Sequence, residues 1–432
     1  MGANMSTGLT EIQRSIKPAR RISESVRSDG TWDTASSPET KIHRIHPYPA
    51  KFPAFLTHMA LEYARTEGIE VSRIADVFCG CGTVAHEAKT EGLAFWGCDI
   101  NPVAVLIATA KSTSFNPVRL EAYTRKVLAA WSSASEDPQL SPAARLRLHH
   151  WFLPDQYRKL AKLLNAIKIA IPERSIYRTA FLCAFSAILK SCSQWRQRSV
   201  KPNFDKKKVP ADVLTTFERQ CRFMVAAWGD ASPATTASVR IRRANFLTVE
   251  APSTPVDLII TSPPYVTSYE YADLHQLSSL WLGYADDHRD LRVGSIGSTQ
   301  HDLDFRREYR RLNEVGMELV FGLYDRDPAT ARSVANYLID MQDVAQRCYD
   351  FIRQDGLAVF VIGNTEYRGI KVDNAAHLAE SLFQAGFGKI RATRRGISNK
   401  KHTPFRNDDG RFSRNPSDKN IYSEEYILMA HK

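Results

Sequence analysis

The feature that most constrains this chain is an apolar run that ends at two consecutive prolines. Residues 256–261 read Val-Asp-Leu-Ile-Ile-Thr, and Ser262-Pro263-Pro264-Tyr265 follows directly. The run has the length and β-branched content of a buried strand. Proline has no N–H and cannot extend a strand ladder. The sequence therefore predicts a stiff loop at residue 262 that offers a hydroxyl group, backbone carbonyls and an aromatic ring.

A loop of this composition suits a flat heterocycle that carries an exocyclic amine. Pro263 and Pro264 contribute carbonyls without a competing N–H, so these carbonyls can accept hydrogen bonds from a ligand amine. The ring of Tyr265 can stack on a heterocycle. Taken alone, the tetrapeptide is equally compatible with a proline-rich turn after a core strand.

A glycine-rich loop follows a second apolar run, some 180 residues upstream. Residues 74–78 predict a strand, residues 79–83 read Cys-Gly-Cys-Gly-Thr, and a helix is expected from residue 84. Glycine permits a tight turn and close approach to a ligand, and Thr83 is placed as a helix N-cap. The next strand-like run ends on Asp99, whose carboxylate is placed to accept ribose hydroxyls. Asn101-Pro102 then begins a helix over residues 103–111.

These segments together resemble the amino-methyltransferase group of S-adenosylmethionine-dependent DNA methyltransferases. Residues 78–83 match its cofactor loop, and Ser-Pro-Pro-Tyr at 262–265 matches its catalytic motif in the form most often seen in N4-cytosine enzymes. His-Pro-Tyr-Pro-Ala-Lys-Phe at 46–52 resembles the additional cofactor motif of the group. Residues 359–364 and 426–429 match later strands, and the resemblance covers roughly residues 42–111 and 240–432.

The resemblance implies an α/β fold, a Rossmann-like doubly wound methyltransferase sheet with a helical insertion. Residues 41–112 and 237–432 would form the catalytic domain. Residues 113–236 would form a basic helical insertion, with helices expected over 157–171, 176–189 and 214–228 from their apolar spacing. Residues 1–40 are rich in Ser, Thr and Arg, and we expect a flexible tail there.

Charge is concentrated in the expected insertion. The chain of 432 residues carries 58 Lys and Arg against 47 Asp and Glu, a net charge of +11. Residues 141–230 contain 17 basic and 6 acidic residues, so the remainder is close to neutral. A basic segment of this kind fits a polyanionic partner, although a solvated helical surface is the plainer interpretation. With the resemblance, it predicts contact with double-stranded DNA.

The site residues predicted from the motifs fall into three groups. The catalytic residues are Ser262, Pro263, Pro264 and Tyr265. The cofactor-binding residues are Lys51, Phe52, Phe78, Gly80, Cys81, Gly82, Thr83, Asp99, Asn101 and Asn245. The DNA-binding residues are Arg196, Arg198, Lys201, Lys206, Lys207, Lys208, Arg394 and Arg395.

The implied reaction is methylation of the N4 amine of cytosine in duplex DNA, with S-adenosylmethionine as cofactor. The alternative within the group is methylation of adenine N6, because both amines present the same donors. An RNA base methyltransferase, a protein glutamine methyltransferase and a DNA-binding subunit without catalysis are less favoured. Cytosine C5 methylation is disfavoured because no cysteine follows a proline. The resemblance also implies a restriction–modification or other defence role, and a cognate restriction or defence component as a possible partner.

The remaining sequence features favour a cytoplasmic protein that binds no metal. Seven cysteines without framework spacing indicate reduced thiols. Cys79 and Cys81 lack the second pair that a zinc site needs. No apolar run reaches the ~18 residues of a membrane helix, and no signal pattern begins the chain, so no membrane partner is expected.

Overall fold

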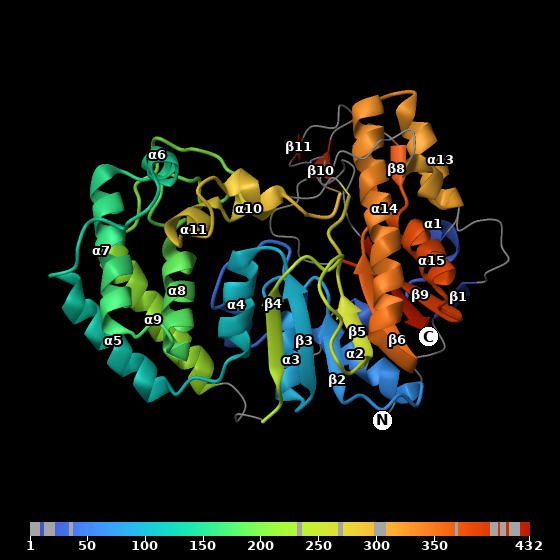
Figure 1. The fold of residues 1–432 in the computed structure, drawn as a ribbon, viewed down its shortest axis with the longest axis horizontal. Helices are drawn as coiled ribbons and strands as arrows, with labels where there is room; N and C mark the ends of the chain where they lie inside the picture. The colour runs from blue at the N-terminus through green and yellow to red at the C-terminus, as the bar shows by residue number, and fades with distance from the viewer. Residues whose placement is uncertain are drawn as a thin grey trace.

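The computed structural model describes residues 9–12, 22–33, 38–230, 236–266, 271–297, 308–367, 370–397, 405–406, 412–413 and 424–432. These residues form an α/β domain beside a block of helices (Figure 1). The domain centres on an eight-stranded sheet in the order β1-β9-β12-β6-β5-β2-β3-β4. Its strands are β1 (Thr10–Ile12), β2 (Arg73–Asp76), β3 (Ala94–Asp99), β4 (Val239–Arg243), β5 (Val256–Thr261), β6 (Ile352–Ile362), β9 (Lys389–Gly396) and β12 (Glu424–His431).

The strand order determines where a ligand can bind. β4, β3, β2, β5 and β6 are parallel neighbours, whereas β12 runs antiparallel to both β6 and β9. The chain moves outward from β2 through β3 to β4, returns to β5 beside β2, and continues outward to β6. This topology confirms the predicted Rossmann-like doubly wound class. In such sheets ligands bind beyond the carboxyl ends of the strands where the order reverses, here between β2 and β5.

Helices cover both faces of the sheet and bury two separate hydrophobic clusters. One cluster packs sheet residues such as Ile74 and Leu258 against α2 (Ala54–Thr66) and α3 (Thr83–Thr90). The other packs Ala75, Ile259 and their neighbours under three helices of the opposite face. These helices are α13 (Glu314–Tyr324), α14 (Pro328–Phe351) and α15 (Asn374–Ala385). The sheet is therefore buried on both faces, which explains the continuous apolar runs of β5 and β6.

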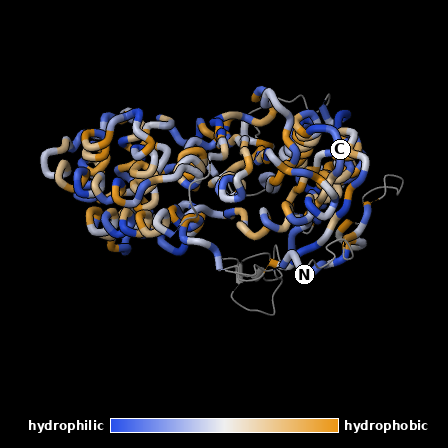
Figure 2. Tube along the Cα trace, turned by 90° about the horizontal axis from the view of Figure 1, so that it is seen from below, coloured by the Kyte–Doolittle hydropathy of each residue, from blue (hydrophilic) through white to orange (hydrophobic). Residues whose placement is uncertain are grey.

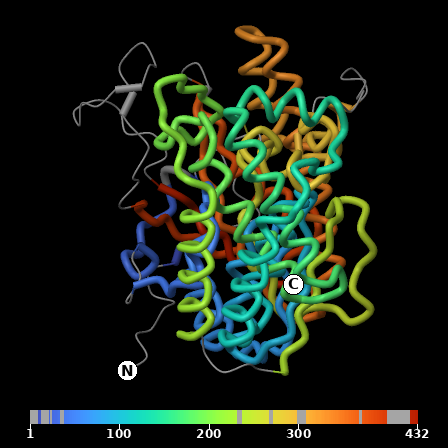
Figure 3. Tube along the Cα trace, turned by 90° about the vertical axis from the view of Figure 1, so that its left-hand side faces the viewer, coloured from blue at the N-terminus to red at the C-terminus, as the bar shows by residue number. Residues whose placement is uncertain are grey.

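The block of helices lies beside the β4 edge of the sheet and has its own hydrophobic cluster. Its helices are α5 (Pro117–Trp131), α6 (Pro142–Trp151), α7 (Pro154–Ala170), α8 (Ile176–Ile188) and α9 (Val213–Gly229). α4 (Pro102–Ser112) connects the block to the domain, since α8 packs against it. Apolar and polar residues alternate along the tube in both parts of the molecule (Figure 2), and Figure 3 looks onto the block.

The three helices expected in this block are present as α7, α8 and α9, with ends that differ from the prediction by at most three residues. α7 begins earlier than expected because Pro154 occupies a first-turn position, where the missing N–H costs nothing. Within the described residues, no helix combines the length and apolarity that crossing a membrane requires.

Shorter elements complete the described chain. They are α1 (Ile22–Ser25), α10 (Tyr271–Leu274), α11 (Gln276–Trp281), η1 (Gly30–Trp32), η2 (Lys41–Arg44), η3 (His288–Arg292) and η4 (Tyr309–Arg311). Two antiparallel pairs lie outside the main sheet, namely β7 (Thr365–Tyr367) with β8 (Ile370–Val372), and β10 (Phe405–Arg406) with β11 (Phe412–Ser413).

The described part of residues 1–40 does not fit the expected flexible tail. β1 pairs antiparallel with β9 and forms the edge of the sheet. Trp32 is completely buried, and Asp33 accepts a hydrogen bond of 2.7 Å from the backbone N–H of Gly396. The composition of this segment has no periodicity to reveal these contacts because they are made with residues more than 350 positions away.

Asp257 holds the first residues of three central strands, β2, β5 and β6, together. These amino ends lie at the opposite end of the strands from the candidate site. Oδ2 of Asp257 accepts hydrogen bonds from Ser72 N, Ser72 Oγ and Arg73 N, each at 2.8 Å. Its Oδ1 accepts from Arg353 Nε at 2.6 Å. Burial tends to raise the pKa of Asp257, but these hydrogen bonds outweigh it and lower the pKa below its usual value. The carboxylate therefore stabilises the fold above its ordinary pKa, and this contribution is lost as the pH falls.

We expect Asp257→Ala to lower the free energy of unfolding by about 3 kcal/mol, because it leaves Arg353 and two backbone N–H groups without their acceptor. Urea denaturation at pH 7 measures this change. Asp257→Asn, which keeps one oxygen acceptor, is the matched variant and should lose less. A loss below about 0.5 kcal/mol for Asp257→Ala, as for an ordinary surface change, would contradict this role.

Candidate active site

Two loops leave neighbouring parallel strands at the same edge of the sheet. β2 pairs with β5, with Ile74 opposite Leu258 and Ala75 opposite Ile259. The glycine loop over residues 77–82 follows β2, and residues 262–265 follow β5. The two motifs that are far apart in the sequence are thus brought together by strand pairing, at the point where the strand order reverses.

Asp76, the last residue of β2, connects these two loops, and the sequence analysis did not identify it. Its Oδ1 accepts hydrogen bonds from Thr261 Oγ1 at 2.7 Å and from the backbone N–H of Phe78 at 3.1 Å. Burial raises the pKa of Asp76 to about 7, against the opposing effect of these two hydrogen bonds. The available signal in the sequence was a carboxylate within an apolar run, directly before the glycine loop.

The two glycines of the loop have different reasons to lack a side chain. Gly82 has φ of 74°, and a Cβ there would lie 2.6 Å from Cα of Ala108 in α4. Gly80 has φ of 49°, but its nearest neighbour, the ring of Tyr48, would lie 3.7 Å from a Cβ. Gly82 is also the N-cap of α3, and Thr83 is the first helical residue, so the prediction of Thr83 as the cap is wrong. The close approach of α4 requires glycine at the N-cap position, which lies one residue before the cap that was expected.

Asp99 lies at the end of β3 and is held by backbone groups alone. Its Oδ2 accepts from Gly80 N and its Oδ1 from Asn101 N, both at 2.8 Å. Burial raises its pKa to about 6, while the two hydrogen bonds act in the opposite direction. Each carboxylate oxygen has a further lone pair, so the group can accept hydrogen bonds from a diol. Asn101 itself caps α4 through Val103 N at 2.9 Å, and its Nδ2 lies 2.7 Å from His275 Nδ1.

A cavity of about 170 Å³ lies at the ends of β3 and β4 and begins at Ile100, the residue after Asp99. It is lined by Ile100, Arg243, Ala244, Asp290, Leu291 and Val293. Asn245 follows directly, but both polar atoms of its side chain are used within the protein. Nδ2 donates to the carbonyl of Gly294 at 3.1 Å, and Oδ1 accepts from Leu247 N at 2.9 Å. Direct contact between Asn245 and a cofactor stays a prediction; in this structure Asn245 holds the loop that borders the cavity.

The side chains of the other residues predicted to bind a cofactor make contacts with neighbouring parts of the protein. Phe78 packs edge-on against Phe246, with ring centroids 6.2 Å apart. Cys81 is buried, and its Sγ lies 3.2 Å from Nζ of the buried Lys111. Lys51 donates to the carbonyl of His43 at 3.0 Å and pairs with Glu39. Phe52 packs against the cluster under α2 and α3. The side chains of Lys51 and Phe52 therefore support the fold of residues 46–52.

Within this segment, Tyr48 is the residue that reaches the glycine loop. Its ring lies next to Gly80, stacks on Tyr271 at 6.1 Å and meets His275 at 5.0 Å between centroids. Burial, above all, raises the pKa of Tyr48 well above 10, so its hydroxyl remains protonated. Tyr48 lies inside the motif quoted from the sequence, but its aromatic character alone did not distinguish it from core residues.

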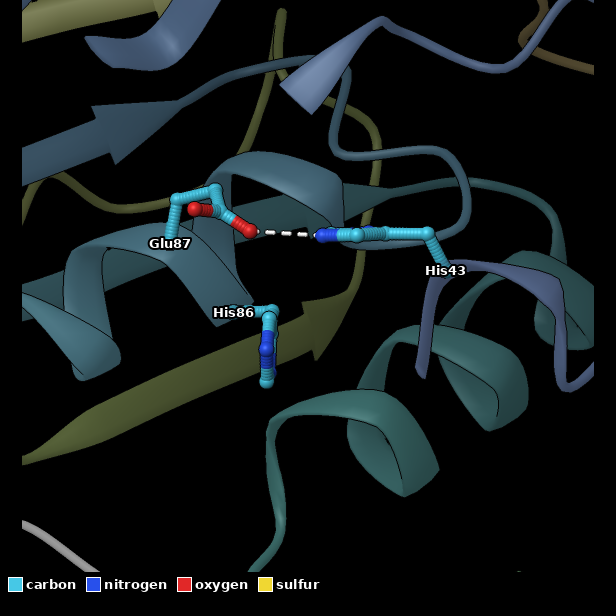
Figure 4. Close-up of side chains that lie close together, drawn as sticks. All are labelled: His43, His86 and Glu87. Carbon is cyan, nitrogen blue, oxygen red and sulfur yellow. Dashed lines mark hydrogen bonds and ion pairs between the residues drawn. The ribbon is translucent and has the colours of Figure 1, made fainter. Parts of the chain in front are cut away.

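A hydrogen-bond cluster around the buried Glu87 holds the segment before Tyr48 against α3. Glu87 Oε1 lies 2.6 Å from Nε2 of the buried His43 (Figure 4). Glu87 Oε2 lies 2.6 Å from Nε2 of the more exposed His58 in α2. His86 Nδ1 meets the carbonyl of Lys111 at 3.2 Å. Burial tends to raise the pKa of Glu87, but the two histidines lower it to about 2. His43, His86 and Glu87 are chemically suited to bind a metal ion; the direct contacts of Glu87 with two histidines instead give this cluster a structural role.

The tetrapeptide at residues 262–265 places one aromatic ring in a defined position. Pro263 is buried, whereas Ser262, Pro264 and Tyr265 are partly exposed. The Tyr265 hydroxyl donates to Glu425 Oε1 at 2.9 Å. Its ring lies against Gly363, at which a Cβ would come within 2.7 Å of the ring. The sequence analysis missed Glu425, because nothing near residue 425 indicates a partner 160 residues away.

The basic residues predicted to bind DNA differ in their accessibility. Arg196, Arg198, Lys201, Lys206 and Lys207 are exposed on the helical block. Lys208 is not a free surface group, because its Nζ donates to the carbonyls of Lys190 at 2.6 Å and Trp195 at 2.8 Å. Burial, above all, lowers the pKa of Lys208 to about 8. Lys208 therefore stabilises the loop that presents the other basic residues.

The two residues of β9 that were predicted to bind DNA each form an ion pair with a glutamate of β12. Arg394 lies 3.5 Å from Glu424 and is about one third exposed. Arg395 is 4% exposed, and its Nε lies 3.1 Å from Glu425 Oε2. A buried guanidinium cannot contact a phosphate at the surface, so the prediction for Arg395 is wrong for this structure. The alternation of side chains along β9 places Arg394 and Arg395 on opposite faces.

Comparison with known proteins adds an independent line of evidence. No protein-family model matches the chain. The chain is 23% identical over 421 residues to the Type II methyltransferase M.MvaI of Kocuria varians, which covers 89% of this chain and 90% of that protein. This similarity supports methyltransferase as the class of the protein.

Two solved structures of the rRNA methyltransferase aviRa from Streptomyces viridochromogenes also match. They are 10% and 11% identical and cover 90% of this chain, and the matches span 91% and 89% of the aviRa chains. Both have a TM-score of 0.30, which is too low to establish a shared fold.

We expect Gly82→Ala to lower the free energy of unfolding by about 2 to 5 kcal/mol, from left-handed strain and from the clash with the backbone of α4. Gly80→Ala is the matched control, because it carries the strain but has room for a methyl group, and should cost about 1 to 2 kcal/mol. Urea denaturation compares the two variants. Equal losses would contradict the assignment of Gly82 to helix packing.

Proposed function

We propose that this protein is an S-adenosylmethionine-dependent DNA methyltransferase that acts on the exocyclic N4 amine of cytosine in duplex DNA. The observation that carries the proposal is the position of Ser262-Pro263-Pro264-Tyr265 at the carboxyl end of β5, directly beside the glycine loop that follows β2. One loop suits a planar amine-bearing base, and the other suits a nucleoside cofactor. The similarity to a Type II methyltransferase over most of the chain supports the same reaction class.

The residues at the ends of β2, β3 and β4 fit S-adenosylmethionine. Asp99 retains acceptors for the two ribose hydroxyls, and the loop containing Gly80 presents bare backbone to the methionine portion. The cavity that begins at Ile100, the residue after Asp99, is lined by Arg243 and Asp290 as well as by Ile100, Ala244, Leu291 and Val293, and it is the proposed place for the adenine. When bound, the cofactor supplies an electrophilic methyl group on a sulfonium.

The residues of the β5 loop prepare the amine to accept that methyl group. An exocyclic amine is a poor nucleophile because its lone pair is delocalised into the ring. In the proposed mechanism the Ser262 hydroxyl and the Pro263 carbonyl would accept hydrogen bonds from the two N–H groups of the amine and so increase electron density on nitrogen as it pyramidalises. The proton that nitrogen loses on methylation would leave to solvent. Holding nitrogen in line with the methyl group contributes through orientation. Tyr265 stacks on the base after it leaves the helix, which offsets part of the unstacking cost.

Cytosine N4 is the proposed target because serine occupies the first position of the catalytic motif. Adenine N6 is the alternative, since its amine offers the same two donors. Arg196, Arg198, Lys201, Lys206 and Lys207, the exposed basic residues of the helical block, are the proposed contacts with the phosphate backbone. We further propose a restriction–modification or related defence role, with a cognate restriction or defence component as partner.

Incubation with labelled S-adenosylmethionine and unmethylated duplex DNA, followed by digestion to nucleosides and mass spectrometry, tests the proposal. We expect N4-methylcytosine with the wild-type protein and none with Ser262→Ala/Tyr265→Ala, which removes an acceptor and the stacking ring. N6-methyladenine instead would retain the mechanism and replace the base. Product on RNA alone, or no binding of S-adenosylmethionine, would contradict the proposed function.

We expect the affinity for S-adenosylmethionine to fall as the pH drops below about 6, by up to about tenfold per pH unit. Burial raises the pKa of Asp99 to about 6 in the free protein. Ribose hydroxyls favour the ionised carboxylate, so binding requires proton release below this pH. Isothermal titration calorimetry from pH 8 to pH 5, with circular dichroism as a folding control, measures the dependence.

Asp99→Asn is the control for this pH dependence, because its amide does not titrate. We expect weaker binding with a flatter pH profile. An equal slope in both proteins would assign the titration to another group and contradict the role of Asp99.

A further inference from the structure

The Tyr265 ring is held at two points by residues from other parts of the sheet. Its hydroxyl donates to Glu425 Oε1 at 2.9 Å. One edge of the ring lies so close to Gly363, at the end of β6, that a Cβ there would sit 2.7 Å from it. Burial raises the pKa of Tyr265 well above 10, and the Glu425 carboxylate raises it further, so the phenol stays a hydrogen-bond donor. The ring therefore has restricted freedom to rotate before any base arrives.

Glu425 is itself fixed by a cross-strand ion pair. Glu425 in β12 lies directly opposite Arg395 in β9. Its Oε2 is 3.1 Å from Arg395 Nε, and the two side chains are 18% and 5% exposed. The Arg395 guanidinium also lies over the ring of Phe55, 5.5 Å from its centroid. One carboxylate oxygen of Glu425 thus accepts a hydrogen bond from Tyr265, and the other lies beside the buried guanidinium of Arg395.

The neighbouring acidic residue provides a contrast within the same strand. Glu424 points to the other face of the sheet, pairs with Arg394 at 3.5 Å and is 42% exposed. It accepts a hydrogen bond from Tyr426 at 3.2 Å. Two glutamates in sequence therefore make one ion pair each, but only the pair involving Glu425 connects to the tetrapeptide at 262–265.

We propose that Glu425 is a positioning residue for methyl transfer, which fixes the Tyr265 ring in the orientation that receives the target base. This inference rests on the proposed function. A flipped base stacks productively only on a ring of defined tilt, and small displacements at a reacting centre reduce rates by large factors. Arg395, which was expected to bind DNA, would act by orienting Glu425.

Three sets of variants test this role. Glu425→Ala should lower kcat for DNA methylation by about 10- to 100-fold, with the Kd for S-adenosylmethionine changed less than about twofold. Tyr265→Phe should give a similar loss, and Glu425→Ala/Tyr265→Phe should lose little more, because both remove one interaction. Glu424→Gln, the matched control on the other face, should retain wild-type kcat.

The charge-matched double variant Arg395→Gln/Glu425→Gln distinguishes the positioning of Tyr265 by Glu425 from a contribution of the ion pair to the stability of the fold. It removes the buried cation together with its partner and keeps an oxygen to accept the Tyr265 hydroxyl. We expect its kcat to lie within about fivefold of wild type. Melting temperature and cofactor binding establish that each variant is folded. Wild-type kcat in Glu425→Ala, or additive losses in the double variant with Tyr265→Phe, would overturn the proposal.

A readout that needs no activity distinguishes this proposal from the proposed function. The ¹⁹F resonance of 3-fluorotyrosine at position 265 should show one ordered ring environment in the parent protein and averaged or multiple environments after Glu425→Ala. Identical spectra would overturn the positioning role. Failure of the parent protein to methylate DNA would contradict the proposed function, whereas the ¹⁹F comparison would still decide whether Glu425 holds the ring.

Discussion

The site depends on the parallel pairing of β2 with β5, and on the buried carboxylate of Asp76 that continues this pairing beyond the strands. Asp76, the last residue of β2, accepts hydrogen bonds from the hydroxyl of Thr261, the last residue of β5, and from the backbone N–H of Phe78 in the glycine loop. Displacement of either strand by one residue would leave this buried group without partners. The relative position of the two loops is consequently part of the folded core.

Around this connection, each candidate binding group is held by a partner from a different element. The backbone N–H of Gly80 donates a hydrogen bond to Asp99, and the hydroxyl of Tyr265 donates one to Glu425. Glu87 of α3 is hydrogen-bonded to His43. Such support keeps chemical groups in place before a ligand arrives, which is the condition for orientation and electrostatic effects in catalysis. The exposed basic residues of the helical block take no part in these contacts, and a surface charge acts at long range without such exact positioning.

The sequence was sufficient for those parts of the fold that local chemistry dictates. Proline ended β5 and glycine shaped the loop after β2, so both loops and the α/β class were predictable. Interactions between distant segments were not predictable. Asp33 and Glu425 have hydrogen-bond partners 363 and 160 residues away in the sequence, and a charge such as Arg395 gives no local sign of burial. Gly82 replaced Thr83 as the helix cap because α4 approaches too closely for a side chain.

Nucleoside analysis of genomic DNA, from a host that expresses the protein and otherwise lacks N4-methylcytosine, tests most directly whether the two loops form one methyl-transfer site for a base amine. We expect N4-methylcytosine with the wild-type chain and none with Asp76→Leu, which removes the acceptor that connects the loops and leaves each motif intact. Unchanged methylation in a folded Asp76→Leu protein, or no methylated base with the wild-type chain, would contradict a single shared site.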